Sequence, residues 1–586
     1  MKQINGMVQF LKNGILSTAK RFPITTFSLS VITGLVCYLI WLPRTSPLII
    51  EKLIFTLLIC ALAGVDAQFL SERLKKTEGV RLYAYCGALL FAVLYFILLL
   101  LPASKITDKV GIYSLIAAFA LVCAMLIFPS AKGRFDFNKG ALIHFKSVFT
   151  SVLYAGVLSI GISAVIAAIN LLLFTVSSNT YAYTMAVIWI LFAPIYYLSL
   201  LPVFEVETDR AEETQNEPIV PKFLEILISY ILIPVIAAYT LVMFAYFAKI
   251  LLTLKWPIGQ LGIMGLIYSA VGLILFVLAS LLKNRFSQLY CKIFPKVLVP
   301  IVIVQLVSVA IRLKAYGVTE SRYYVALFGV FSICAGVFLS IKPVTKNIVI
   351  AYLAAFFAII SLVPPIDAFT VSQKSQLIRI ETILETEGML KDGVLTPKQN
   401  VSDNAKFETT SILSYLNNRD TLKSIQWLPK NFDLNQDFSK TFGFETRYSR
   451  DGIQPQTESY LTLDDTKPIA VSGYDFYISI SNYSNDLNLN YSGVPYRLSY
   501  ENRFITLKNT VGKQLLNEDL TEFFKTLQKK WVNSGKSSLD PEDMTFEHAE
   551  NGYKIKIVFK DISLHNTEEK NNVTNFQATA FFSVPK

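Results

Sequence analysis

The fold is decided by residues 298–327, LVPIVIVQLVSVAIRLKAYGVTESRYYVAL. An almost continuous aliphatic run ends near Leu313, and apolar sequence resumes at Val325. Between the two runs, Gly317 suits the position just after a helix, because a positive φ costs glycine little. Thr319 suits the N-cap of the following helix, whose first turn favours an acidic side chain. The stretch therefore predicts two membrane helices joined by a tight turn.

Charged and tyrosine side chains crowd this predicted turn. The candidate site residues are Arg312, Tyr316, Glu320 and Arg322. An ion network among the charged groups would hold the hairpin together; alternatively, two guanidinium groups flanked by tyrosines would bind an anion. Neutralising Arg312 would destabilise the fold on the first hypothesis. On the second, it would remove ligand or activity from a protein that still folds.

The composition divides the chain into two parts. The sequence of 586 residues is 53% hydrophobic and 17% charged. Residues 1–366 carry 29 Lys and Arg against 14 Asp and Glu, whereas residues 367–586 carry 25 against 29. A membrane domain followed by a water-soluble domain is the resulting prediction. Because the basic excess lies in short loops between apolar segments, it does not indicate a nucleic-acid partner.

About eleven segments are long and apolar enough to span a bilayer, which is the predicted partner of this part of the chain. They are 22–42, 48–70, 82–102, 110–129, 147–176, 183–203, 224–250, 261–282, 294–313, 323–341 and 346–366. Residues 1–21 are predicted to form an amphipathic cytoplasmic segment. The predicted domains are therefore 1–21, the transmembrane domain 22–366 and the soluble domain 367–586.

The orientation follows from the basic residues of alternate loops. With the N-terminus inside, the inner loops hold 20 Lys and Arg and the outer loops and edges hold nine. This bias favours a cytoplasmic N-terminus. An odd number of helices then places residues 367–586 outside the cytoplasm.

The C-terminal part is predicted to be an α+β domain built on an antiparallel sheet. Residues 371–390 and 399–418 are helix-like. Alternating patterns such as Phe476-Ile478-Ile480 then indicate strands. A further helix is expected at 518–532, with Asn517 as its N-cap.

The sequence predicts no catalytic residue, metal site or cofactor. The six cysteines and three histidines are scattered, and no nucleotide or hydrolase motif is present. Asp66, Asn170 and Glu225 are the candidate intramembrane polar residues. Both acids fall near predicted helix ends, which favours an interfacial position over a proton relay. Asn170 extends the small-residue stripe of Ser147, Ser151, Ala155, Ser159, Ser163 and Ala167, and we expect it to bond to a neighbouring helix.

Several stretches together resemble one family. They are Arg21-Phe22-Pro23, the stretch from Ala63-Gly64 to Glu72-Arg73, Ile231–Lys249, and Arg312-x-x-x-Tyr316-Gly317-x-Thr319-Glu320-x-Arg322-Tyr323. The family is that of bacterial polytopic membrane proteins known as domain of unknown function 4153. The resemblance covers residues 1–370 and extends to Gly473-Tyr474-Asp475. It implies a bacterial inner-membrane location and a many-helix fold, and it supplies no activity and no catalytic residue.

Three functions remain open at this point. The leading hypothesis is a non-enzymatic envelope protein whose extracytoplasmic domain, residues 367–586, binds an envelope protein partner or senses the envelope. A secondary transporter is the alternative, because Pro234 and Pro300 fall inside predicted membrane helices. The third is a membrane-embedded transferase with its site at the edge formed by Arg312 and Arg322.

Overall fold

The structure is a computed structural model with two compact units, Met1–Ile383 and Leu384–Lys586. It describes residues 16–42, 47–74, 78–103, 105–131, 135–204, 220–253, 260–434, 436–448, 459–464, 467–482, 487–501, 503–509, 512–534, 538–550, 552–567 and 570–585. The greater part of the predicted amphipathic segment 1–21 lies outside these ranges. The predicted boundary after residue 366 lies before helix α15 (Ala368–Thr386), whereas the two units divide after Ile383. Most of α15 therefore belongs to the first unit.

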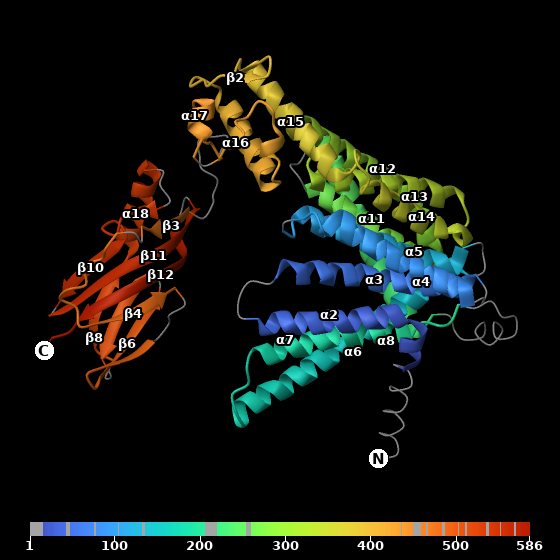
Figure 1. The fold of residues 1–586 in the computed structure, drawn as a ribbon, viewed down its shortest axis with the longest axis horizontal. Helices are drawn as coiled ribbons and strands as arrows, with labels where there is room; N and C mark the ends of the chain where they lie inside the picture. The colour runs from blue at the N-terminus through green and yellow to red at the C-terminus, as the bar shows by residue number, and fades with distance from the viewer. Residues whose placement is uncertain are drawn as a thin grey trace. The chain divides into compact units, whose positions relative to one another are not determined.

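The first unit is a set of apolar helices lying side by side (Figure 1). Ten helical stretches of its described residues are long and apolar enough to cross a membrane. They comprise α2 (Pro23–Trp41), α3 (Leu48–Arg73), α4 (Glu78–Tyr95), α5 (Asp108–Ser130), α6 (Phe137–Leu172), α7 with α8 (Asn179–Ala186, Ala193–Ser199), α9 with α10 (Lys222–Ile226, Ile233–Thr253), α11 (Gln260–Ala279), α12 (Arg285–Tyr316) and α13 (Glu320–Ile341). Short π-helical segments join α7 to α8 and α9 to α10. The predicted many-helix membrane fold is confirmed.

The eleventh predicted segment contains a shorter helix, α14 (Ile348–Ile360). Just before it, Asn347 Nδ2 donates to Asn138 Oδ1 (2.8 Å) at the start of α6. Just after it, the carbonyl of Ile366 accepts from Tyr323 Oη (2.6 Å) at the start of α13. Since α6 begins at the end of the unit where α13 finishes, this segment runs from one end of the unit to the other. The helix itself is about 20 Å long, shorter than a typical hydrocarbon core of about 30 Å.

Small residues bring the helices into close contact, as the stripe on α6 predicts. Ser151 Oγ donates to the carbonyl of Ala193 in α8 (2.6 Å), and Trp189 Nε1 donates to Ser159 Oγ (3.0 Å). On α11, a Cβ added to Gly265 would lie 2.2 Å from Gln305 Oε1 of α12. These backbones approach closely only because the residues between them are small.

The central hairpin forms as the sequence predicts. Gly317 follows α12 with a φ of +67°, and Thr319 occupies the N-cap position of α13. Pro295 and Pro300 lie inside α12 without ending it. The helix is therefore continuous where a transporter built on broken helices would be interrupted.

The second unit contains two antiparallel-rich sheets (Figure 1). Strands β4 (Phe476–Ser481), β12 (Lys570–Ser583), β11 (Tyr553–Thr567), β3 (Ser459–Leu463) and β9 (Ser538–Leu539) lie in that order, and β10 (Thr545–Glu550) also pairs with β11. The other sheet has the order β5 (Leu487–Tyr491), β6 (Val494–Glu501), β7 (Phe504–Asn509) and β8 (Gln514–Asp519). The remaining elements are α16 (Asp403–Asn418), α17 (Phe438–Phe442), α18 (Thr521–Ser534) and the hairpin of β1 (Leu390–Lys391) with β2 (Val394–Leu395). The predicted α+β class is confirmed.

One cap in this unit was predicted wrongly. Asn517 and Glu518 lie in β8, and α18 begins at Thr521. Asp519 Oδ1 accepts from the N–H of Thr521 (2.8 Å). The strand extends this far because Asn517 pairs with Thr506 of β7, a contact that no local pattern shows.

Candidate functional site

The predicted site residues of the helical unit fall at two opposite ends. The hairpin end contains the turn between α12 and α13 and the starts of α5 and α15. The Arg21 end contains the starts of α2 and α6 and the ends of α3 and α8. Because α14 and its flanking turns run between these ends, the chain enters α2 at one end and leaves through α15 at the other.

At the hairpin end, the side chain of Arg322 bonds to the backbone of the turn. Its Nη1 donates to the carbonyls of Tyr316 (3.1 Å) and Gly317 (2.8 Å), and its guanidinium lies 5.5 Å from the centre of the Tyr316 ring. Glu320 is buried in the first turn of α13. The two bonds from Arg322 therefore stabilise the turn.

Helix α15 adds further bonds to the same turn. Gln376 Nε2 donates to the carbonyls of Tyr316 (3.0 Å) and Val318 (2.8 Å), and the N–H of Val318 donates to Ser375 Oγ (2.9 Å). Arg379 Nη1 donates to the carbonyl of Tyr316 (3.3 Å). We call this set of bonds from Ser375, Gln376 and Arg379 the α15 clasp. The sequence pattern around the turn gave no indication of these partners.

The start of α15 is fixed by its own cap. Asp367 Oδ1 accepts from the N–H groups of Phe369 and Thr370 (both 3.0 Å) and from Tyr113 Oη of α5 (2.6 Å). Burial raises the pKa of Asp367, but the bonds from Thr370 and Tyr113 and the charge of Lys109 outweigh burial and leave the pKa below its usual value. A carboxylate with a lowered pKa contributes stability above its unfolded pKa of about 4, and this contribution is lost as the pH falls through the folded pKa.

A small cavity separates α12 from α13 near the turn. Its volume is about 150 Å³, and its polar lining consists of Arg312, Arg322, Ser308 and Ser321. Arg312 Nε has no hydrogen-bond partner among the described residues. The structure thus brings the two predicted arginines to one cavity, and both the ion-network and the anion-site hypotheses remain predictions.

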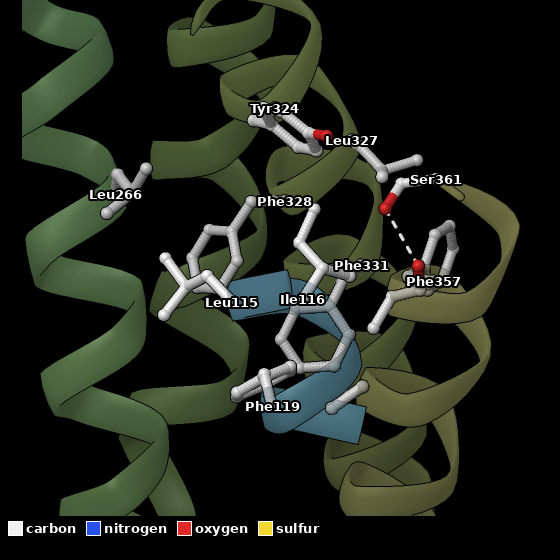
Figure 2. A pocket seen from close by; sticks show the side chains of 12 residues that line it. Leu115, Ile116, Phe119, Leu266, Tyr324, Leu327, Phe328, Phe331, Phe357 and Ser361 are labelled. Carbon is white, nitrogen blue, oxygen red and sulfur yellow. Dashed lines mark hydrogen bonds between the residues drawn. The ribbon is translucent and has the colours of Figure 1, made fainter. Parts of the chain in front are cut away.

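An apolar cavity of about 400 Å³ lies on another face of α13 (Figure 2). Its walls come from α5, α11, α13 and α14, with Phe119, Phe328, Phe331 and Phe357 among the lining side chains. Tyr324 and Ser361 lie together at one end, and Ser361 Oγ donates to the carbonyl of Ala358 (2.7 Å). A cavity lined in this way can accept hydrocarbon, with the two hydroxyl groups confined to one end.

The Arg21 end is organised by a buried ion pair. Arg21 Nε lies 2.7 Å from Glu72 Oε1, and the Glu72 side chain is only 4% exposed. Arg21 Nη1 also donates to the carbonyl of Leu201 (2.6 Å), while Gln68 Nε2 donates to Glu72 Oε1 (2.8 Å). Tyr85 Oη donates to Gln68 Oε1 (2.7 Å). This network joins α2, α3 and α4 to the segment that follows α8, and it connects two of the stretches that carry the family resemblance.

Asp66 lies two turns before the end of α3 and is buried, at 6% exposure. Neither carboxylate oxygen has a hydrogen-bond partner in the described part of the chain. Asp66 is thus enclosed by neighbouring helices, and its expected interfacial position stays a prediction. Close to it on α3, the Phe69 ring packs against Phe204, which follows α8, with 5.3 Å between ring centroids.

The other two intramembrane candidates lie at helix ends. Glu225 Oε1 accepts from Asn284 Nδ2 (3.1 Å), the N-cap residue of α12, in agreement with an interfacial position. Asn170 is exposed, and its Oδ1 accepts from the N–H of Val176 (2.7 Å). The expected bond from Asn170 to a neighbouring helix is not what the structure shows. Close to the end of α6, the amide instead satisfies a backbone group just beyond the helix.

One group in the second unit has the spacing of metal ligands. Ligand atoms of Glu518, His548 and Glu550 lie within 4.8 Å of one another. His548 Nε2 is 3.2 Å from Glu518 Oε1, so the two also pair directly. Burial raises the pKa of Glu518, His548 opposes this effect and Glu550 adds to it. Among the described residues this is the set that could hold a divalent cation.

The α15 clasp gives a test at a single glycine. A Cβ at residue 317 would lie 2.8 Å from Gln376 Nε2. The backbone at this residue also has φ +67° and ψ 177°, a conformation essentially restricted to glycine, so alanine adds strain of about 1–3 kcal/mol. Gly317→Ala is therefore expected to increase hydrogen exchange in residues 368–383. The matched control is Gly493→Ala, where φ is +80° and no atom lies within 4 Å. Unchanged exchange in α15 of the Gly317→Ala protein would contradict this assignment.

Comparison with known proteins identifies relatives of the helical unit. The family model described as "Domain of unknown function (DUF4153)" matches residues 30–389. An uncharacterised protein of Pasteurella multocida is 22% identical over 315 residues, which cover 53% of this chain and 52% of that protein. The match thus spans about half the length of this curated relative. No solved structure matches.

Proposed function

Since the chain belongs to the DUF4153 family, whose description assigns no activity, we propose a function from the geometry. The protein is a non-enzymatic membrane protein of the bacterial cell envelope. Its helical unit anchors the chain, and its α+β unit binds an envelope protein on the extracytoplasmic side. The α15 clasp is the observation that carries this proposal.

The clasp supports an anchoring role because it uses the polar groups of the hairpin. The carbonyls of Tyr316, Gly317 and Val318 accept bonds from Arg322 and Gln376. The carbonyls of Tyr316 and Val318 in this set bond to Gln376 and so fix the helix through which the chain leaves the membrane unit.

The extracytoplasmic position rests on two observations together. The chain enters α2 and leaves through α15 at opposite ends of the helical unit. Basic residues are concentrated in the loops at the entry end, which favours a cytoplasmic position for that end. The second unit then belongs on the far side of the membrane.

An aromatic surface on the second unit supports binding to a protein. Tyr477 of β4 is 70% exposed, and its ring lies 5.8 Å from that of Phe581 on β12, which in turn lies 6.1 Å from Tyr474. Among the described strands β4 pairs with β12 alone, so it also forms an edge of its sheet. An exposed tyrosine packed on half-buried aromatic side chains beside a free strand edge is typical of protein interfaces.

Site-specific photo-crosslinking in intact cells tests the proposal. A photoreactive amino acid at residue 477 is expected to give discrete protein adducts. The same probe at Glu522 on α18, also well exposed, is the control. Adducts at 477 that disappear in a Phe581→Ser protein would support a specific partner. Equal adducts at both positions, or none at 477, would contradict the proposal.

A further inference from the structure

The buried carboxyl of Asp66 is the most unusual group in the helical unit. Its side chain lies on α3 at 6% exposure, and both of its oxygens lack a hydrogen-bond partner among the described residues. Buried carboxyl groups are ordinarily paired or hydrogen-bonded, because an isolated charge loses several kcal/mol of hydration. Because no described protein group bonds to this carboxyl, another species must compensate for its charge.

A histidine and a tyrosine complete the surroundings. His144 Nδ1 lies 2.6 Å from Tyr197 Oη, and His144 Nε2 has no partner in the described part of the chain. Tyr197 packs against the apolar cluster that contains Val65 and Phe69, the α3 residues on either side of Asp66 in the sequence. The His144 ring stacks on Phe204, 6.3 Å between centroids, and meets the edge of Phe69 at 6.0 Å. His144 thus has an unsatisfied nitrogen in an aromatic enclosure, and its bond to Tyr197 connects it to the cluster beside Asp66.

The charged and titratable groups near this enclosure come from every helix that packs on it. They are Glu72 on α3, Arg21 before α2, Tyr85 on α4, Cys123 on α5, His144 on α6 and Tyr197 on α8. Arg21 and Glu72 neutralise each other directly. The network therefore leaves Asp66 without a positive partner of its own.

We propose that Asp66 is a proton-binding site of the membrane domain, with His144 and Tyr197 as its acid–base neighbours. The proton is favoured over a metal cation because hard cations need about six oxygen ligands. The side chains clustered at this part of α3 are instead mostly apolar. They include Val65 and Phe69 of α3 itself, Met125 and Leu198. Binding a proton removes the charge and needs no further ligand, which fits surroundings made mostly of apolar side chains. The site makes the helical unit sensitive to proton concentration, an activity independent of partner binding by the second unit.

Infrared spectroscopy of the full-length protein in lipid vesicles tests this proposal. The carbonyl stretch of a protonated carboxylic acid is expected at neutral pH, where an ordinary aspartic acid is ionised. Asp66→Asn is expected to lose this band completely. Glu225→Gln, which changes an acid at a helix end, is expected to keep it. Asp66→Glu retains the acid and is expected to shift the band without removing it, which separates loss of the group from misfolding.

The same spectra, recorded once in sodium salt and once in potassium salt, distinguish a bound proton from a bound metal cation. The band of the wild-type protein is expected to be the same in either salt. Ionised carboxylate bands at neutral pH that depend on Asp66 and shift between the two salts would overturn the proposal in favour of a cation site. Ionised bands without any salt dependence would overturn it in favour of an unliganded charge.

Discussion

Replacing Glu72 by alanine is expected to cost the helical unit about 3–5 kcal/mol of unfolding free energy. The reason is that Arg21 would keep its charge in a site where its main counter-charge, 2.7 Å away, has been removed. Gln68 and the N–H of Phe204 would lose an acceptor at the same time. Hydrogen exchange of the detergent-solubilised protein should show faster opening of α2 and α3.

An exposed ion pair provides the control. Glu522 pairs with Lys525 on α18 at 2.7 Å, but its side chain is 82% exposed. Glu522→Ala is therefore expected to change stability by no more than about 1 kcal/mol. Equal effects of the two substitutions would show that the Arg21–Glu72 pair does not hold the helices together.

Phe559→Ala is expected to destabilise the second unit by about 3–5 kcal/mol. Phe559 is fully buried, and its ring centre lies 5.2 Å from that of Phe523, 5.5 Å from Phe524 and 5.4 Å from Phe576. The substitution leaves a cavity where β11, β12 and α18 meet. Exchange should rise in the strands and in α18 between residues 459 and 585, and it should stay unchanged in the helices of the first unit.

An exposed aromatic residue of the same unit separates packing from surface effects. Tyr477→Ala is expected to alter stability by about 0.5 kcal/mol or less, because Tyr477 is 70% exposed. If Phe559→Ala also accelerated exchange in α3 or α12, the division into two independently packed units would be wrong.

The hairpin shows how far local sequence determines this fold. Glycine at 317 and threonine at 319 mark the turn, and both occupy the predicted positions. The partners that hold the turn come from α15, and Gln376 lies 60 residues after Tyr316. Local patterns predict helix ends, but they do not indicate which distant helix will reach them.

The same limit explains the residues that sequence reasoning missed at the Arg21 end. His144 was one of three scattered histidines, and its neighbour Tyr197 lies 53 residues away. Asp66 was placed at an interface because charged residues follow it in α3. Asp66 is only 6% exposed, because of packing between helices that the local sequence does not show. The resemblance between motifs was the one signal that linked Arg21 to Glu72.

Cysteine labelling from one side of the membrane tests the central claim, an odd number of crossings, most directly. In a background without the six native cysteines, single cysteines would replace Lys283 at the Arg21 end, Lys314 at the hairpin end and Thr526 in the second unit. A membrane-impermeant maleimide added outside spheroplasts is expected to label residues 314 and 526 and to leave 283 unlabelled until the membrane is opened. Labelling of 283 together with 526 from the same side would contradict the account.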